Sequence, residues 1–581
     1  MSTVFVNDIE VEVGPRDNLI QAARAAGVEI PHYCWHEALS VVASCRMCLV
    51  EVGEKKPDGT IAMGPKLVPA CQTPAKPGTV VKTETAKVKT GQQMTLEFLL
   101  LNHPLDCSIC DQAGECYLQD YTYKFGKAQS RLNEPKVQRL DKYHIGEQIA
   151  LFTDRCVMCT RCVRFTREIS GTAELQVVAR GSVEEIDVFP NKPCNNKLAG
   201  NVVDLCPVGA LCSKDFLYKK RVWWLKSQKS VCAGCSTGCS IEVDQNEDHV
   251  YRLRPRANPL AQGHFMCDEG RFGFKYVQST NRLSGPTSKS IATVGVAASA
   301  VTKFNGNVAG KLFQPADLAV VDHWPAAIQE AREKIKAAVD SSASSFAAVF
   351  SPMMSVEEAY LLASYLKGLN RNVKLLMGPV PVVGEDDCYP KNVNGSAPTA
   401  EKTKFTIRAE KCPNRLGVEK VLKHFQGALV PIEDAIQGAH GIQAWYFVGG
   451  YATPDDSIGW VSPSIAKATE PAKLLIVQDI FPSVLSKRAD IVFAGAAFTE
   501  RDGTFINHSG LAQAFRAATR PPQASRADGR ILNELCLRQG LYNTEFLRKE
   551  IASKIPSLES LSVGDLGVHG VELHQLVGAH L

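Results

Sequence analysis

A short run of cysteines near residue 160 constrains this 581-residue chain more than any other feature. Cys156, Cys159 and Cys162 are separated from one another by two residues, and Cys206 follows downstream, directly before Pro207. Three thiols at this spacing, completed by a later Cys-Pro, are typical of backbone that wraps a cubic [4Fe-4S] cluster. Because protein ligands fix the position and potential of a redox cofactor, the pattern predicts an electron carrier.

The distribution of the other cysteines supports metal binding. Of the 20 cysteines, 17 lie at or before Cys267. No apolar run approaches the ~18 residues of a membrane span, and residues 1–12 alternate like a strand instead of forming an export signal. We therefore expect a reducing, cytosolic environment, in which close-set cysteines ligate metal. A net charge of +4 without a long Lys/Arg block argues against nucleic acid and lipid headgroups as partners.

The first ninety residues predict a small, strand-rich domain. Val4–Val6 and Ile9–Val13 alternate around the turn pair Asn7-Asp8, which favours a hairpin. Asp17 is the expected cap of a helix that closes at Gly27. The hairpin, the helix and the cysteine loop that follows resemble the plant-type [2Fe-2S] ferredoxin domain.

Four cysteines are the candidate ligands of this first site. The ferredoxin pattern is C-x4-C-x2-C with a distant fourth cysteine. In this chain Cys34 and Cys45 are separated by ten residues, Cys48 keeps the short gap, and Cys71 is the only candidate for the fourth position. By spacing alone, a zinc site or unligated thiols remain alternatives.

A second site follows a predicted helix. Apolar residues fall on one helical face between Thr85 and Leu101, and they include Val88, Met94, Leu96, Phe98 and Leu99. The next four candidate ligands are His103, Cys107, Cys110 and Cys116. A neutral imidazole carries less negative charge than a thiolate, so one nitrogen ligand should raise the potential of a cluster. A zinc site of one His and three Cys, or a histidine that caps the helix end, are the alternatives.

The central run is expected to hold one cluster. Thr166 stands where each half of a two-cluster bacterial ferredoxin has its fourth cysteine, so a second cluster lacks a ligand. Cys206 is the expected closing ligand, because Pro207 and Gly209 favour a tight return of the chain. Cys194 and Cys212 are nearby competitors and are otherwise buried free thiols.

Four arginines surround the central run. They are Arg155, Arg161, Arg164 and Arg167. Cationic charge near an anionic cluster favours the reduced form of the cluster. A solvated or docking face is the alternative interpretation of these arginines.

A fourth group of cysteines follows Trp223 and Trp224, which we expect to be core or packing aromatics and not electron stations. The group consists of Cys232, Cys235, Cys239 and Cys267. The pattern C-x2-C-x3-C-x27-C resembles the N-terminal cluster domain of the molybdopterin oxidoreductases. A zinc ribbon could use similar spacing.

Beyond residue 285 the sequence predicts an α/β domain behind a linker at 279–290. The expected helices and strands are Pro325–Val339, Phe346–Phe350, a helix capped by Ser355 with Glu358 and reaching Leu369, Val373–Met377, Trp445–Val448, Leu474–Val477 and Ile491–Phe493. This alternation favours a largely parallel sheet. No G-x-G-x-x-G or P-loop follows any strand, so no nucleotide site is expected.

Residues 498–513, FTERDGTFINHSGLAQ, resemble a segment of the molybdopterin oxidoreductases that lies close to the pterin. Physically, Asp502-Gly503 is expected to be only a turn between two apolar stretches. This half offers no Cys next to His as a metal ligand, and it is shorter than the enzyme domain of that family. The expectation is therefore that the fold was kept and the pterin lost.

In this order, the four sites closely resemble the family of large iron–sulfur subunits of respiratory complex I, in its bacterial form. The resemblance is specific over residues 1–285 and looser beyond. It implies a multidomain α/β and α+β chain: a β-grasp [2Fe-2S] ferredoxin-like domain at 1–84, a helical [4Fe-4S] segment with one His and three Cys ligands at 85–140, a bacterial ferredoxin-like [4Fe-4S] domain at 141–220, a molybdopterin-oxidoreductase-type [4Fe-4S] domain at 221–285, and a degenerate molybdopterin-oxidoreductase-like α/β domain at 286–581.

The resemblance implies one [2Fe-2S] and three [4Fe-4S] clusters, no molybdopterin, and no catalytic residue or substrate site in this chain. Its role would be single-electron relay within the proton-pumping NADH:quinone oxidoreductase. The expected partners are the flavin- and NADH-binding subunit and the hydrophilic subunits on the quinone side. The chain would lie on the cytoplasmic side of the inner membrane, and only the complex would attach it there. The alternative is the large subunit of a NAD-linked formate dehydrogenase or hydrogenase.

Overall fold

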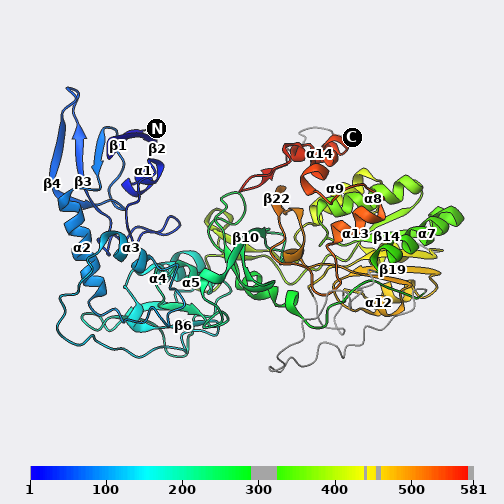
Figure 1. The fold of residues 1–581 in the computed structure, drawn as a ribbon, viewed down its shortest axis with the longest axis horizontal. Helices are drawn as coiled ribbons and strands as arrows, with labels where there is room; N and C mark the ends of the chain where they lie inside the picture. The colour runs from blue at the N-terminus through cyan, green and yellow to red at the C-terminus, as the bar shows by residue number, and fades with distance from the viewer. Residues whose placement is uncertain (1, 290–322, 438–440, 453–459, 574–581) are drawn as a thin grey trace, which may run out of the picture. The chain divides into compact units, whose positions relative to one another are not determined.

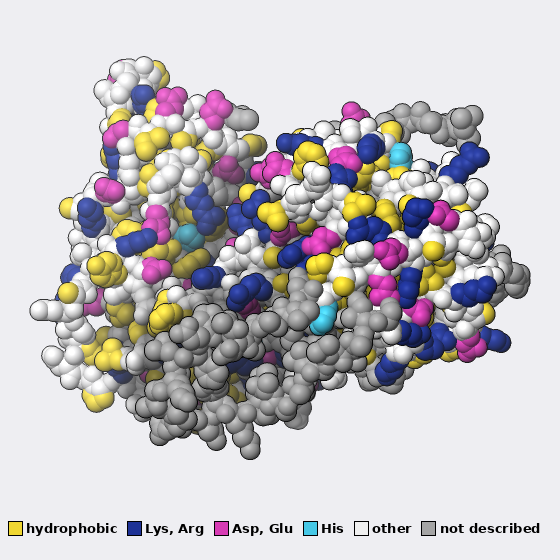
Figure 2. All heavy atoms as spheres, turned by 45° about the vertical axis from the view of Figure 1, so that its right-hand side comes forward, with side chains coloured by type: hydrophobic (Ala, Val, Ile, Leu, Met, Phe, Trp, Pro, Cys, Tyr) yellow, Lys and Arg dark blue, Asp and Glu magenta, His cyan; other side chains and the backbone are white. Residues whose placement is uncertain are grey.

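The computed structural model describes residues 2–289, 323–437, 441–452 and 460–573. They form two compact units (Figure 1). Unit 1 consists of Met1–Lys226, His264–Arg271 and Asp387–Ile407, and unit 2 consists of Ser227–Gly263, Phe272–Asp386 and Arg408–Leu581. No helix in the described ranges is both long and apolar enough to cross a membrane. On the face drawn in Figure 2, basic and acidic side chains are interspersed.

Unit 1 begins with a five-stranded sheet of order β2-β1-β5-β3-β4 that packs on one helix. The elements are β1 (Ser2–Val6), β2 (Ile9–Val13), α1 (Leu19–Ala25), β3 (Leu49–Lys55), β4 (Ile61–Pro69) and β5 (Thr79–Lys82). β1 and β2 pair as the predicted hairpin. Asn7 and Asp8 have φ angles of 46° and 73°, as a tight two-residue turn between twisted strands requires.

The cap of α1 differs from the prediction. Asn18 is the N-cap, and its Oδ1 accepts a hydrogen bond from the backbone amide of Gln21 at 3.1 Å. The Gln21 side chain accepts one from the Asn18 amide at 3.0 Å, which completes a capping box. Asp17 instead accepts from the amide of Gly14 at 2.7 Å. The helix ends before Gly27, as predicted.

Short helices and loops make up the remainder of unit 1. The helices are α2 (Ala86–Leu100), α3 (Tyr117–Phe125), α4 (Arg161–Phe165), the π-helical turn η2 (Thr166–Ser170), α5 (Asn201–Leu205) and α6 (Asp268–Phe272), whose last residue belongs to unit 2. The strand pairs are β6 (Ile149–Leu151) with β9 (Leu211–Ser213), β7 (Leu175–Val178) with β8 (Glu185–Val188), and β16 (Asp387–Tyr389) with β17 (Phe405–Ile407). Because these sheets have only two short strands each, loops make up much of this part of unit 1.

The apolar face expected for α2 is confirmed only in part. Val88 and Leu96 are buried, whereas Met94 and Phe98 are 51% and 77% exposed. Side-chain type alone therefore does not predict burial along this helix.

The expectation for the paired tryptophans also holds only in part. Trp223 and Trp224 lie in the 3-10 turn η3 (Val222–Trp224) and are 58% and 61% exposed, so they are not core aromatics. The Trp223 ring nevertheless packs against Gly114.

Unit 2 contains the predicted α/β layer structure. Its six-stranded sheet has the order β13-β20-β19-β18-β14-β15, and every pair except β13 with β20 is parallel. The strands are β13 (Thr287–Ser288), β14 (Phe346–Phe350), β15 (Lys374–Met377), β18 (Ala444–Val448), β19 (Leu474–Asp479) and β20 (Ile491–Ala494). The largely parallel sheet that the sequence predicts is thus confirmed.

Helices cover both faces of this sheet. Alternate residues of β14 show the division: Phe346, Ala348 and Phe350 join one core cluster, while Ala347 and Val349 join another. The first cluster includes α7 (Trp324–Ser342), α8 (Val356–Leu369), α9 (Arg415–His424), α13 (Asp528–Leu535) and α14 (Thr544–Lys554). The second includes α10 (Ile432–Gln437), α11 (Pro463–Ala468) and α12 (Val484–Arg488). Figure 1 shows α8 and α12 on opposite sides of β19.

Local signals in unit 2 are mostly confirmed. Ser355 and Glu358 form the predicted capping box of α8. The predicted linker, in contrast, is built into the fold over its described residues. Its residues 287–288 form the edge strand β13, and Arg282 forms a buried ion pair with Glu500 at 2.5 Å. The linker expectation failed because the partner of Arg282 lies more than 200 residues away.

Two small sheets complete unit 2. β10 (Lys226–Val231), β11 (Ser240–Asn246) and β12 (His249–Pro255) form one sheet, and β21 (Gly503–Ile506), β22 (Leu511–Phe515) and β23 (Val571–Glu572) form the other. The turn expected at Asp502-Gly503 lies later in the chain, because Gly503 already begins β21 and Asn507 accepts the hydrogen bond from Gly510 at 3.1 Å.

Candidate metal centres

The first four candidate ligands lie together at one end of the five-stranded sheet. Cys45 and Cys48 precede β3 and Cys71 follows β4, and these antiparallel strands bring them to the same end. Hydrogen bonds from the Cys45 and Cys71 thiols hold the pKa of Cys34 well below its ordinary value. Cys48 is likewise within reach of Cys71. Four thiolates this close repel one another, so positive charge between them would stabilise the group.

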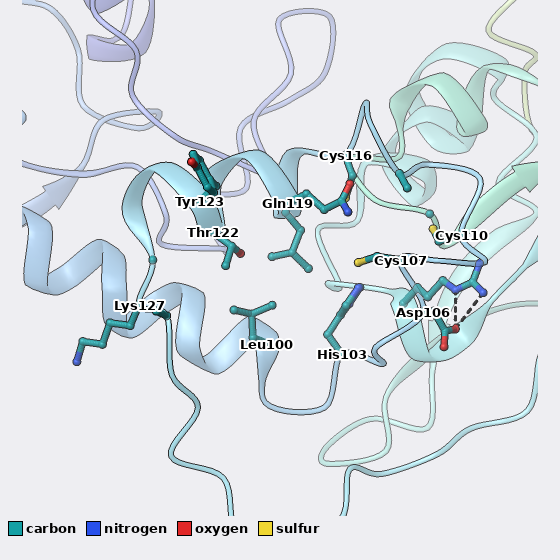
Figure 3. Close-up of a pocket in the computed structure, with 16 residues that line it drawn as sticks. Leu100, His103, Asp106, Cys107, Cys110, Cys116, Gln119, Thr122, Tyr123 and Lys127 are labelled. Carbon is teal, nitrogen blue, oxygen red and sulfur yellow. Dashed lines mark hydrogen bonds and ion pairs between the residues drawn. The ribbon is translucent and has the colours of Figure 1, made fainter. Parts of the chain in front are cut away.

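The second group lines a cavity of about 580 Å³ in unit 1 (Figure 3). His103, Cys107, Cys110 and Cys116 all contribute to its wall. The Nδ1 of His103 is buried and has no hydrogen-bond partner among the described residues. Burial, with smaller contributions from Lys136 and Arg155, lowers the pKa of His103 to about 4. A neutral imidazole with a free nitrogen is the form that ligates metal.

Arg155 belongs to this second cavity. Its guanidinium lies on the Asp106 carboxylate, with Nε 3.0 Å and Nη2 2.9 Å from Oδ2. It also lies 4.1 Å from the centre of the Phe152 ring. The arginine is buried and lines the same cavity as His103. The ion pair of Arg155 with Asp106 therefore lies at the cavity that the three thiols line, and the guanidinium interacts electrostatically with Cys110.

The central group surrounds a second, smaller cavity. Cys156, Cys159, Cys162 and Cys206 all line it. Between the cysteines, Met158 and Thr160 have φ angles of 50° and 57°, so the backbone winds tightly around the cavity. The Met158 amide points at the Cys156 sulfur, 3.4 Å away. Amides directed at sulfur favour a thiolate, as a cluster ligand requires.

The two competing cysteines lie away from this cavity wall. Cys194 and Cys212 are buried and do not line it. The Cys212 thiol donates to the carbonyl of Gly209 at 3.6 Å, and the Cys194 sulfur is 3.8 Å from Asn196 Nδ2. Burial raises the pKa of both thiols, as it also does for the four cysteines that line the cavity, so position and not pKa distinguishes the two competitors from the candidate ligands.

Three of the four arginines near the central run are buried, so the solvated-face interpretation is wrong for them. Arg161 and Arg164 are 4% and 7% exposed, and Arg155 is 3% exposed, whereas Arg167 is exposed. The guanidinium of Arg164 donates to the carbonyl of Cys34 and, at 3.2 Å, to that of Cys159. One side chain therefore joins the first and central thiol groups, a link that charge pattern alone did not reveal.

The central group also touches the second group. The Tyr117 amide, next to Cys116, donates to the carbonyl of Pro207 at 3.1 Å. Gly209 runs so close to Cys110 that a side chain at 209 would overlap its sulfur. The three groups of unit 1 thus form a continuous series with the central group in the middle.

The fourth group is divided between the two units. Cys232, Cys235 and Cys239 lie in the loop between β10 and β11 of unit 2, where the Cys232 amide donates to the Cys239 carbonyl at 2.8 Å. Cys267 lies in unit 1, where its sulfur accepts from the Gly270 amide at 3.3 Å. In unit 2 the Gly234 amide points at the Cys232 sulfur, 3.4 Å away, so amide-to-sulfur contacts are present in both parts. The joint ligand set stays a prediction.

The segment 498–513 supports the cysteine loop of unit 2. Asn507 Nδ2 donates to the carbonyl of Thr237 at 3.0 Å, and Gln513 Nε2 donates to that of Gly238 at 2.6 Å. Gly238 has a φ of +64° and would meet Asn507 if it carried a side chain. Sequence reasoning treated this segment as a turn and did not predict this role.

In the ranges that the structure describes, no group of three or more His, Cys, Asp and Glu side chains has the close spacing of a single-ion site.

Family models match five consecutive parts of the chain. They are a 2Fe-2S iron–sulfur cluster binding domain (1–86), the NADH-ubiquinone oxidoreductase-G iron–sulfur binding region (92–131), the ferredoxin-like domain of NADH-quinone oxidoreductase subunit 3 (146–212), the molybdopterin oxidoreductase Fe4S4 domain (225–279) and molybdopterin oxidoreductase (391–538). Each of the first four matches contains one complete group of candidate ligands.

Curated relatives carry consistent names. A NADH-quinone oxidoreductase subunit of Rickettsia felis is 35% identical over 64% of this chain and 50% of its own length. The mitochondrial NADH dehydrogenase [ubiquinone] iron-sulfur protein 1 of Solanum tuberosum is 42% identical over 49% of this chain and 37% of its own. The mitochondrial NADH-ubiquinone oxidoreductase 78 kDa subunit of Candida albicans is 27% identical over 92% and 82%. The chain thus spans about half the length of the first relatives it matches.

Proposed function

We propose, because the chain belongs to the family of large iron–sulfur subunits of NADH-quinone oxidoreductase, that it relays single electrons from a flavin-bearing subunit that oxidises NADH toward quinone. Bound iron–sulfur clusters would supply the one-electron chemistry. The residues of this chain hold the clusters, exclude water and set their charge environment. The chain itself would contribute no substrate site.

The continuous series of thiol groups in unit 1 carries this proposal. A relay needs its stations close together and fixed, and the contacts of Arg164 and Gly209 join the central group to a neighbour on each side. An isolated ferredoxin-like domain would have no need of either contact. A [2Fe-2S] cluster would be held by Cys34, Cys45, Cys48 and Cys71, and [4Fe-4S] clusters by His103 with Cys107, Cys110 and Cys116, and by Cys156, Cys159, Cys162 and Cys206.

The fourth group would hold a further [4Fe-4S] cluster on Cys232, Cys235, Cys239 and Cys267, with a mainly structural role. The α/β domain beyond residue 285 would be a scaffold without molybdopterin. In support, polar side chains of the segment 498–513 already form hydrogen bonds and ion pairs within the domain. Thr504 Oγ1 donates to Glu357 at 2.6 Å, and Glu500 accepts from Arg282 on both oxygens.

The partners would be the flavin-bearing subunit on one side and quinone-side hydrophilic subunits on the other. The chain would lie on the cytoplasmic side of the inner membrane as part of the complex. Electrons would enter at the Cys34 group, pass the Cys156 group and leave from the His103 group.

Freeze-quench EPR of the purified complex tests this order. In Cys156→Ser, NADH should still reduce the [2Fe-2S] cluster within the mixing time, while reduction of the His103-site cluster slows by orders of magnitude. Cys194→Ser, which lies off the cavity wall, is the matched control and should behave like the wild type. Reduction of the His103-site cluster at the wild-type rate in Cys156→Ser, with the central cluster absent, would refute the relay.

A further inference from the structure

The loop between the first two candidate ligands is longer than the ferredoxin pattern requires. Ten residues separate Cys34 from Cys45, where the plant-type pattern has four. We propose that this bridging loop, residues 35–44, and the side chains of Arg161 and Arg164 form a clamp that sets the distance between the first and central clusters. The inference rests on the proposed function only in that both thiol groups carry clusters.

Arg164 is the centre of the clamp. It lies on α4, two residues after Cys162, and its Nη1 donates to the carbonyl of Ser40 in the bridging loop at 2.5 Å. Its Nη2 donates to the carbonyls of Cys34 and Cys159. The guanidinium therefore holds the backbone at both ends of the gap between the two thiol groups, and its planar fork fixes their relative orientation.

Arg161 repeats the arrangement one helical turn earlier. Its Nη2 donates to the carbonyl of Trp35 at 2.6 Å, and its Nη1 donates to that of Leu205 at 3.3 Å. Trp35 directly follows Cys34 and Leu205 directly precedes Cys206. Residues three apart share a helix face, so both arginines point at the same loop.

Two further contacts close the bridging loop onto α4 and η2. The Glu168 carboxylate of η2 accepts hydrogen bonds from the backbone amide of Ser40, at 2.9 Å, and from its hydroxyl. His36 of the loop stacks on Phe265, 6.1 Å between ring centres, and Phe265 contacts Phe165 of α4 edge-on at 5.0 Å. The additional residues of the bridging loop therefore make the contacts with α4 and η2, and the thiols of the first group remain available as cluster ligands.

The clamp also carries charge. The hydrogen-bond acceptors of both buried guanidinium groups are backbone carbonyls, so no carboxylate accepts directly from either, although the Glu168 carboxylate attracts Arg164 electrostatically. An anionic cluster on each side would compensate these positive charges, and the reduced, more negative state would gain most. The clamp should thus influence both the spacing and the potentials of the two clusters.

EPR on the purified full-length holoprotein separates these effects. Arg164→Gln removes the charge and the fork, Arg164→Lys keeps the charge but cannot bridge three carbonyls, and the exposed Arg167→Gln is the control. In Arg164→Gln the reduction potentials of both clusters should fall. The distribution of dipolar couplings between the two reduced clusters should broaden, because the distance between them is no longer fixed. Arg164→Lys should retain near-wild-type potentials with broadened coupling, and Arg167→Gln should match the wild type.

The results of these experiments either support the clamp or overturn it. Wild-type coupling and potentials in both Arg164 variants, at full iron and sulfide content, would overturn the clamp. If Arg164→Gln fails to assemble, Glu168→Ala releases Ser40 of the loop while both arginines and their carbonyl acceptors stay in place, and unchanged coupling in that variant would also overturn the clamp. Absence of clusters from the wild-type protein would instead contradict the proposed function.

Discussion

Gly209 and Cys110 lie in contact, so closely that a β-carbon on residue 209 would overlap the Cys110 sulfur. Gly209→Ala should therefore displace Cys110 and weaken or remove the His103-site cluster, although every candidate ligand is retained. Overpacking of this kind typically costs about 1–3 kcal/mol. EPR of the reduced protein provides the measurement. Gly273→Ala, where no atom lies within 4 Å of the added carbon, is the control and should leave all signals unchanged.

Replacing the histidine ligand should change a potential without removing a cluster. His103→Cys adds a thiolate and therefore negative charge, which lowers the potential of the cluster it ligates. A redox titration followed by EPR should show one cluster shifted downward and the others unchanged. If no potential moves, His103 is not a ligand.

Three serine variants test the closing ligand of the central site. Cys206→Ser should abolish or destabilise the central cluster, because Cys206 lines the cavity with Cys156, Cys159 and Cys162. Cys194→Ser and Cys212→Ser should retain the signal. Loss of the same signal in Cys194→Ser would overturn the choice of Cys206.

The buried ion pair of unit 2 should be costly to break. Arg282 holds Glu500 through both carboxylate oxygens, and both side chains are 3% exposed. Arg282→Met leaves a buried, unpaired carboxylate, which typically costs about 3–5 kcal/mol. Denaturant unfolding should show this loss, and the double variant with Glu500→Gln should recover much of it. Equal stability of the wild type and Arg282→Met would show that the pair contributes little.

Short-range signals were readable from the sequence because covalent spacing controls them. The Asn7-Asp8 hairpin and the capping box of Ser355 with Glu358 depend only on neighbouring residues, and both are present. The cap of α1 was misplaced by one residue, because Asp17 and Asn18 are both good caps and only the backbone direction distinguishes them.

Contacts between residues that are far apart in the chain could not be predicted from the sequence. The sequence leaves open whether the arginines of α4 lie beside a cluster or form a solvated or docking face, whereas in the structure carbonyls more than 120 residues distant in sequence hold Arg161 and Arg164 in the interior. Arg282 looked like part of a linker for the same reason. The cysteine motifs predicted which residues could meet, whereas the contacts that join one group to the next required the fold.

Quantification of iron and acid-labile sulfide, combined with EPR spin counting on the purified protein, tests the central claim most directly. We predict one [2Fe-2S] and three [4Fe-4S] clusters, or about 14 iron atoms and as many sulfides per chain, without molybdenum. Stoichiometric molybdenum, or zinc in place of iron and sulfide, would contradict it.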